Sequence, residues 1–150
     1  MARKRVLILN GPNLNMLGVR EPHIYGTVTL AGIEGMCRTR AEPAGFSIDF
    51  RQSNHEGELV AWIQRARGKC DALIINAAAY THSSLAIHDA LKLLDVPIVE
   101  VHLSNPKERE PFRHHSYIEP LAAVVFAGYG AESYVKAVDW LSTKICDNKS

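Results

Sequence analysis

The sequence predicts an α/β fold in which a five-stranded parallel sheet is covered by helices on both faces. Apolar runs of strand length alternate with helical patterns along the whole chain, and several of these runs lack any polar alternation. Such runs are typical of strands buried on both faces, and alternating strands and helices form parallel sheets with right-handed crossovers. No repeat or linker interrupts the alternation, so residues 1–150 are expected to form a single domain.

The first strand and the first helix lie far apart in the sequence. Val6–Leu9 is a short apolar run that predicts a buried strand. Thr29 is suited to cap a helix that ends near Gly45 and carries an apolar stripe. The residues of that stripe are Leu30, Ile33, Met36 and Cys37.

An edge strand and a second helix follow. Phe46, Ile48 and Phe50 alternate with polar residues, which predicts a half-exposed edge strand. Ser53 or Asn54 then opens a helix that ends at Gly68. The residues expected to face inward from that helix are Leu59, Trp62, Ile63 and Ala66.

The second half of the chain repeats the alternation. Strands are predicted at residues 71–76, 96–102 and 122–127, and a helix is predicted at residues 84–94. The apolar stripe of the last helix consists of Tyr134, Ala137, Val138, Leu141 and Ile145. The complete pattern predicts a flavodoxin-like, doubly wound sheet.

Polar residues follow three of the predicted strands. Asn10 and Asn13 come after the first strand, Asn76 ends the third, and His102 and Ser104 end the fourth. In a doubly wound sheet the ligand site lies beyond the carboxyl ends of the strands. We therefore expect these three strands to converge on one site.

Composition and charge argue against several functional classes. The net charge of +1 offers no strongly basic face for nucleic acid, and no segment fits a signal peptide or a membrane span. Cys37, Cys70 and Cys146 are scattered and form no Cys-x-x-Cys motif. They are expected to be reduced structural thiols, so a cytoplasmic protein without a membrane partner is expected.

A carboxylate and an imidazole share one face of the fourth strand. Because side chains alternate along a strand, Glu100, His102 and Ser104 lie on the same face. A carboxylate beside an imidazole fixes its tautomer and holds it protonated, which suits a general acid. The alternative is a structural histidine near the end of a strand.

The long loop from Asn10 to Gly26 carries a cation and a phenol. Connections in α/β units are usually ~2–6 residues long, and a long loop is often a site or a lid. A phenol has a pKa near ~10, so it acts as a base at neutral pH only beside a cation. Arg20 suits this role for Tyr25 because arginine stays protonated. The alternative is that Tyr25 plugs the loop and Arg20 is solvated.

The turn after the third strand, from Asn76 to Ser84, leads into a helix. Its free N–H groups suit a carboxylate, although Ser83 or Ser84 could equally be simple helix caps. Serine, His82 and Asp89 occur together here, as in a hydrolase, but the sequence has no Gly-x-Ser-x-Gly elbow.

The ligand is expected to be a small anion bound without a cofactor. The charged segment between Pro106 and His115 is expected to be largely solvated, although Arg109 or Arg113 could reach back to an anion. The seven histidines lack zinc-ligand spacing, and the sequence contains neither Gly-x-Gly-x-x-Gly nor a Walker Gly-Lys-Ser/Thr motif. We therefore expect no metal and no cofactor.

Six separated blocks, in the same order, resemble the type II 3-dehydroquinate dehydratases over essentially the whole chain. The blocks are residues 10–15 (NGPNLN), 20–26 (REPHIYG), 52–57 (QSNHEG), 80–84 (YTHSS), 100–105 (EVHLSN) and 112–117 (FRHHSY). The resemblance implies dehydration of 3-dehydroquinate to 3-dehydroshikimate, in the shikimate or quinate pathway, by anti elimination through an enolate.

The resemblance also implies the catalytic roles. Tyr25 would take the C2 proton as the base, Arg20 would keep it ionised, and Asn13 would position a water that stabilises the enolate. His102 would protonate the leaving C1 hydroxyl, with Glu100 orienting it.

The remaining implications concern binding and assembly. The residues implied to hold the carboxylate and hydroxyls of the substrate are Asn76, His82, Leu103, Ser104 and Arg113. Asp89 would reach the site of an adjacent subunit in a dodecamer built from trimers, and residues 13–25 would close as a lid. The run 77–79 is Ala-Ala-Ala where the family often has proline and glycine, so a slightly altered carboxylate pocket is expected.

Two other classes of protein stay open at this point. A flavodoxin-like binding module would not need Tyr25 and His102 together. A regulatory paralogue would bind the substrate without turning it over.

Overall fold

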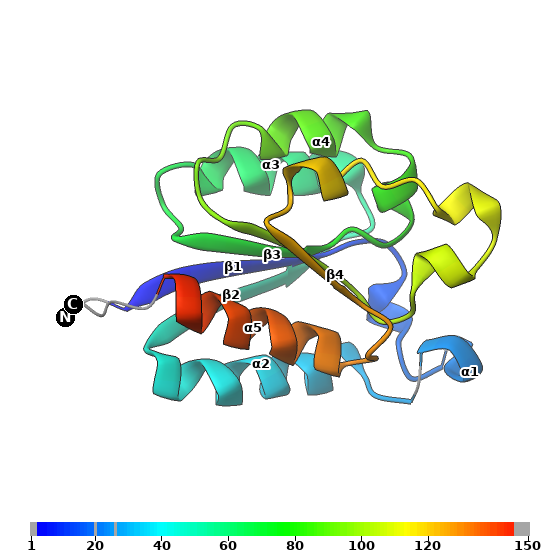
Figure 1. The fold of residues 1–150 in the computed structure, drawn as a ribbon, viewed down its shortest axis with the longest axis horizontal. Helices are drawn as coiled ribbons and strands as arrows, with labels where there is room; N and C mark the ends of the chain where they lie inside the picture. Colours follow the sequence, from blue (N-terminus) through cyan, green and yellow to red (C-terminus); the bar gives the residue numbers. More distant parts are fainter. Residues whose placement is uncertain (1–2, 20, 26, 146–150) are drawn as a thin grey trace.

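Five parallel strands form the centre of the structure, a computed structural model that describes residues 3–19, 21–25 and 27–145 (Figure 1). The strands are β1 (Lys4–Asn10), β2 (Phe46–Gln52), β3 (Ala72–Asn76), β4 (Ile98–His102) and β5 (Val124–Ala127). The helices are α1 (Pro22–Tyr25), α2 (Leu30–Ala44), α3 (Glu56–Ala66), α4 (Leu85–Leu91) and α5 (Glu132–Lys144). Within the described ranges, no helix is long and apolar enough to cross a membrane.

The strand order confirms the predicted flavodoxin-like sheet. The order is β2-β1-β3-β4-β5, and every neighbouring pair is parallel. This is the doubly wound order in which strands run outward from the first strand in both directions. The predicted edge strand, β2, lies at one edge and alternates between exposed and partly buried residues after Phe46.

Helices cover both faces of the sheet. In Figure 1, α3 and α4 lie on one face, and α2 and α5 lie on the other. The alternation of side chains divides β1 between two cores: Val6 and Ile8 belong to the core under α2 and α5, whereas Leu7 and Leu9 belong to the core under α3 and α4. The continuous apolar run in β1 is thus explained by burial on both faces.

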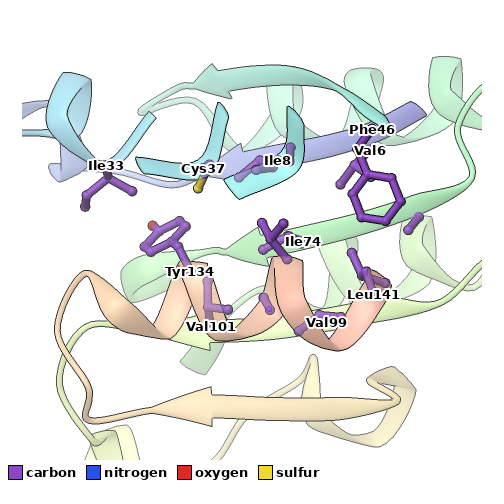
Figure 2. Close-up of a cluster of buried hydrophobic side chains, with 14 of the residues drawn as sticks. Val6, Ile8, Ile33, Cys37, Phe46, Ile74, Val99, Val101, Tyr134 and Leu141 are labelled. Atoms are coloured by element: carbon purple, nitrogen blue, oxygen red, sulfur yellow. The ribbon is translucent and has the colours of Figure 1, made fainter. Parts of the chain in front are cut away.

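Figure 2 shows the core under α2 and α5. Ile33 and Cys37 of α2 and Leu141 of α5 pack with Ile74 and Val99 of the sheet, and each of these side chains is fully buried. Helix α2 begins as predicted, because the Thr29 hydroxyl accepts a hydrogen bond from the Gly32 N–H over 3.1 Å. It ends at Gly45, which adopts a left-handed conformation (φ 77°).

Two helices differ from their predicted bounds. Helix α3 begins at Glu56 because the Ser53 hydroxyl accepts from the His55 N–H over 2.9 Å, which forms a turn before the helix instead of capping it. Helix α4 ends at Leu91, three residues earlier than predicted. The chain continues in two tight turns, in which Leu93 and Leu94 donate to carbonyls three residues back.

The predicted strands at 96–102 and 122–127 are shorter in the structure and begin at Ile98 and Val124. The long first loop contains two short elements that the sequence pattern did not predict, the 3₁₀ turn Leu14–Met16 and α1. Leu14 and Leu17 are buried, which explains the local folding of the loop after β1.

Cys37 and Cys70 are buried free thiols, as predicted for structural cysteines. Burial raises the pKa of the Cys37 thiol to about 12, so it is protonated and unreactive at neutral pH. Cys146 lies outside the described residues.

Candidate active site

The carboxyl ends of β1, β3 and β4 bring together the residues that the sequence predicted to converge. Asn10 and Asn76 are register partners at the ends of β1 and β3, and His102 is the last residue of β4. These ends adjoin a pocket that also receives the loop after β1 and the segment after β4. The residues that line this substrate pocket are Pro12, Asn13, Leu14, Asn76, Ala78, Ala79, His82, His102, Leu103, Ser104, Pro106, Arg109 and Arg113.

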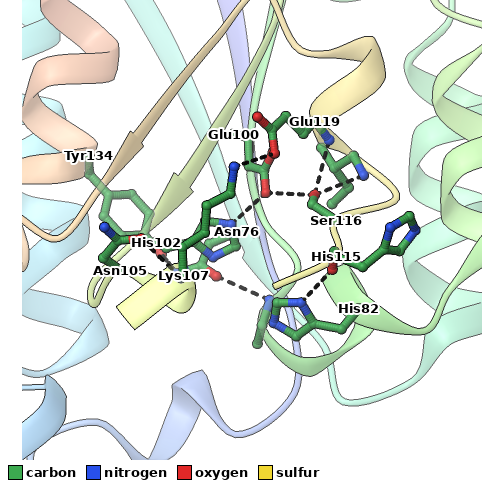
Figure 3. A network of polar contacts seen from close by, with 12 residues as sticks. Asn76, His82, Glu100, His102, Asn105, Lys107, His115, Ser116, Glu119 and Tyr134 are labelled. Atoms are coloured by element: carbon green, nitrogen blue, oxygen red, sulfur yellow. Dashed lines mark hydrogen bonds and ion pairs between the residues drawn. The ribbon is translucent and has the colours of Figure 1, made fainter. Parts of the chain in front are cut away.

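His102 and Glu100 form a buried pair at the edge of this pocket (Figure 3). The His102 Nε2 atom lies 2.6 Å from Oε2 of Glu100, and the Ser116 hydroxyl donates to the same oxygen over 2.9 Å. Because Nε2–H donates to the carboxylate, Nδ1 is the ring nitrogen left for other contacts. The pairing that strand alternation predicted is therefore present, and Ser116 adds a partner that the sequence did not reveal.

A buried hydrogen-bond network joins the ends of β1 and β3 to α5. The Tyr134 hydroxyl donates to Asn10 Oδ1 over 2.6 Å and accepts from Asn76 Nδ2 over 3.0 Å. Burial raises the pKa of the Tyr134 phenol well above its ordinary value, so this tyrosine is a neutral donor. The network fixes the orientation of Asn76 beside the pocket.

Asn76 also holds the turn that follows it. Its Oδ1 atom accepts the Ala78 N–H over 3.1 Å. Ala78 has a positive φ of 54°, a conformation that costs a residue with a Cβ about 1–2 kcal/mol. Both polar atoms of the Asn76 side chain thus serve the protein itself. Ala78 belongs to the run of three alanines at residues 77–79, where the family often has proline and glycine. Among the described residues after β3, it is the one non-glycine position with a positive φ, so glycine would relieve backbone strain there.

His82 lines the pocket from the 3₁₀ turn that follows β3. Its Nδ1 atom lies 2.9 Å from the His115 carbonyl, to which an Nδ1–H donates. Burial lowers the pKa of His82, and the nearby His102 and Arg113 lower it further. A neutral His82 with Nδ1 protonated presents Nε2 as a hydrogen-bond acceptor.

Two arginines supply positive charge to the substrate pocket. Arg113 Nε lies 2.7 Å from the Glu110 carboxylate, and Arg109 Nη1 donates to the Ser104 hydroxyl over 3.3 Å. The sequence left open which of the two reaches a ligand, and the structure brings both to the pocket. A guanidinium group is well suited to bind a carboxylate.

The loop after β1 contributes the other wall. Asn13 adopts a left-handed conformation (φ 69°), and its backbone N–H donates to Asn54 Oδ1 over 3.0 Å. Arg20 and the side chain of Tyr25 lie outside what the structure describes, so their predicted pairing stays a prediction. Tyr25 is the last residue of α1, and its backbone is described.

Ser84, after the turn, has a structural role. Ser84 is buried, caps α4 by accepting from the Ile87 N–H over 2.9 Å, and donates to the Glu56 carboxylate. The capping alternative is therefore correct for Ser84. Asp89 is exposed on α4, does not line the substrate pocket, and makes no ion pair with any described residue.

Two contributing residues escaped sequence reasoning. Tyr134 fits the apolar stripe of the last helix. That pattern does not predict that the Tyr134 hydroxyl forms hydrogen bonds with two asparagines. Ser116 follows two histidines in an irregular segment. Across the described part of the chain, no cluster of three His, Cys, Asp or Glu side chains could hold a metal ion.

The fold and the site together define an α/β protein with a buried histidine–carboxylate pair and two arginines at the carboxyl edge of a doubly wound sheet. A family model described as dehydroquinase class II matches residues 4–142. The chain therefore belongs to the class II dehydroquinase family.

Relatives and solved structures agree with this assignment. A 3-dehydroquinate dehydratase of Azorhizobium caulinodans is 56% identical over 91% of this chain and 92% of its own length. The 3-dehydroquinate dehydratase 2 of Pseudomonas aeruginosa is 52% identical over the same shares. The crystal structure of the type II dehydroquinase from Propionibacterium acnes superposes with a TM-score of 0.90 at 40% identity, covering 94% of this chain and 97% of that one.

Proposed function

We propose that this protein is a type II 3-dehydroquinate dehydratase that converts 3-dehydroquinate to 3-dehydroshikimate by anti elimination through an enolate. The observation that carries the proposal is the buried Glu100–His102 pair beside a pocket with two arginines, in a chain of this family. The substrate is a carboxylate with several hydroxyls, which matches the polar and cationic lining of the pocket.

His102 acts as the general acid. Glu100 accepts from Nε2–H, so the proton for the leaving C1 hydroxyl comes from Nδ1. The C1–O bond breaks with its electron pair on oxygen, and the proton from His102 turns the leaving group into water. A positioned acid of this kind typically contributes ~10²–10⁴ in rate.

Tyr25 acts as the base on the other side of the substrate. As a phenolate kept ionised by Arg20, it takes the C2 proton and leaves an enolate. Asn13, on the wall of the pocket, positions a water that stabilises the enolate oxygen. The loop of residues 13–25 closes over the substrate as a lid.

Several residues orient the substrate. Arg113 binds the carboxylate, with the turn after Asn76 and the neighbouring Arg109 adding positive potential. The backbone at Leu103 and the Ser104 hydroxyl bind ring hydroxyls. His82 accepts one hydroxyl at Nε2, because its Nδ1–H is already donated to a carbonyl.

The first experiment is an ultraviolet assay for the conjugated enone formed from 3-dehydroquinate. Turnover by the purified protein separates an enzyme from a binding module or a non-catalytic paralogue, both of which would give no enone. Treatment with a chelator, or with borohydride in the presence of substrate, should leave the rate unchanged, because the mechanism uses neither a metal nor a lysine. Loss of activity in either treatment would contradict the mechanism.

Assembly completes the site in this proposal. Asp89, exposed and without an ion pair among the described residues, reaches the site of a neighbouring subunit in a dodecamer of trimers. The alternative is local pairing with Lys92 or Arg113. It is disfavoured because Glu110 holds the Arg113 guanidinium and Asp89 makes no ion pair with either residue. Across a urea series, the assembled fraction measured by sedimentation and the activity should decline together. A folded monomer with full turnover would refute the shared site.

A further inference from the structure

A second pocket lies behind the acid pair. The two pockets share His82, His102, Pro106 and Arg113, so these side chains form a partition between them. Glu100 lines only the second pocket, which we call the rear pocket. The other residues that matter for its chemistry are Thr81, Lys107, Ser116, Glu119 and Ala127.

Two buried polar atoms among the residues of the rear pocket have no protein partner. They are Oε1 of Glu100, a residue only 2% exposed, and Oγ1 of Thr81, a residue with no exposed surface. The other carboxylate oxygen of Glu100 already accepts from His102 and Ser116. A buried polar atom without a partner is unfavourable, and proteins commonly satisfy such atoms with bound water.

The outer wall of the rear pocket is a solvated ion pair. Lys107 Nζ lies 3.5 Å from Glu119 Oε1, and both side chains are largely exposed (Figure 3). Pairs of this kind are weak because water competes with them. Water can therefore enter and leave the rear pocket past Lys107 without crossing the substrate pocket.

The partition between the pockets is thin. The His82 and His102 rings are stacked with centroids 6.5 Å apart and an interplanar angle of 18°. Carbon atoms in contact lie about 3.5–4.0 Å apart, so these ring centres are farther apart than in a directly face-to-face stack. The two pockets thus adjoin at these two imidazole rings.

We propose that the rear pocket is a water site, and that it receives the water released at His102 while product still fills the substrate pocket. This inference rests on the proposed dehydration. In the step concerned, the C2–H proton goes to Tyr25, the C1–O bond breaks, and the His102 proton completes the water molecule. That water passes between His82 and His102 and donates hydrogen bonds to Glu100 Oε1 and Thr81 Oγ1.

The proposal gives the Thr81 hydroxyl a function, because packing alone would not require a hydroxyl at this position. Thr81→Val keeps the shape of the side chain and removes a hydroxyl that bonds to no protein group. The folded protein should therefore keep its melting temperature. Loss of the water contact should lower kcat by roughly fivefold, since a bound water is worth about as much as a direct hydrogen bond.

A second variant narrows the rear pocket from another side. Ala127, at the end of β5, lines the rear pocket and not the substrate pocket. Ala127→Val should lower kcat several-fold with KM within twofold of the unchanged protein. The matched control is Ala123→Val, which adds the same bulk at an exposed position just before β5 and should change neither constant.

A high-resolution crystal structure of the complete protein tests the site independently of activity. Ordered water bonded to both Glu100 Oε1 and Thr81 Oγ1 is expected, and a dry rear pocket would overturn the proposal. Unchanged kcat in both Thr81→Val and Ala127→Val, or a rise in KM that accounts for the loss, would overturn the exit route. If the unchanged protein forms no enone, the dehydratase assignment fails while the crystal structure still decides the water site.

Discussion

The two walls of the substrate pocket are built differently. The strand wall carries Asn76 and His102, which are buried and hydrogen-bonded to other side chains. The loop wall carries Asn13, which is exposed and held through its backbone, and Val19 farther along the same loop is 72% exposed. His102, the proposed acid, is thus held by the fold, whereas the proposed base, Tyr25, belongs to the loop that contains these exposed residues.

The difference has a physical cause. Parallel strands hold each other through ladder hydrogen bonds and cores on both faces, so a side chain at a strand end has little freedom. A loop on the surface gains little from burial, so it is free to open and close over a ligand. A lid must be weakly held, and an acid in a buried pair must be firmly held.

The largest expected effect tests both walls at once. His102→Ala and Tyr25→Phe should each lower kcat by ~10²–10⁴, because each removes a proton-transfer group. Only His102→Ala should also lower stability, by about 1–3 kcal/mol, because it leaves the buried Glu100 carboxylate short of a partner. Enone kinetics and thermal melting measure the two effects.

Tyr129→Phe serves as the control for this pair, since Tyr129 is exposed and does not line the pocket. It should change neither rate nor melting temperature. Near-normal turnover in His102→Ala or Tyr25→Phe would refute the assignment of acid and base.

Limited proteolysis tests the mobility of the loop wall. Trypsin should cut the free protein after Arg20, next to the exposed Val19. A substrate analogue at ten times its dissociation constant should slow this cut by about tenfold, because the closed state is stabilised by mass action. A tryptic cut elsewhere in the chain, which the ligand should not change, serves as the control. Equal cleavage after Arg20 with and without ligand would mean that the loop does not close on the ligand.

The network behind the strand wall allows a matched comparison on one helix. Tyr134→Phe and Ser133→Ala each remove a buried hydroxyl from α5, and each should cost about 1–2 kcal/mol of stability. Only Tyr134→Phe frees Asn76 and the turn beside the pocket, so only it should raise KM, by roughly threefold to tenfold. Equal KM values in the two variants would show that Tyr134 is purely structural.

The smallest expected effect concerns the strained turn. Ala78→Gly should stabilise the protein by up to about 1 kcal/mol, because glycine adopts the positive φ of this position without strain. The control is Ala79→Gly, because Ala79 is exposed and does not have a positive φ. This variant should not be more stable than the original protein. Denaturant unfolding of the two variants measures the difference, and a less stable Ala78→Gly would contradict the strain argument.

The sequence by itself determined the fold class and the pairing of Glu100 with His102. Apolar runs such as Val6–Leu9, and their alternation with helical stripes, require a parallel sheet whatever the details of packing. The spacing of Glu100 and His102 places both on one face of β4, because side chains alternate along a strand.

Tertiary structure decided everything that depends on distant segments meeting. The chain separates Tyr134 from Asn10 by 124 positions, and no local pattern reports that hydrogen bond. The rear pocket likewise needs Thr81, Glu100 and Ser116 from three separate segments. Local periodicity encodes which face of an element is buried, but the partner of a buried polar atom is set by how the elements pack, and that information is spread over the whole chain.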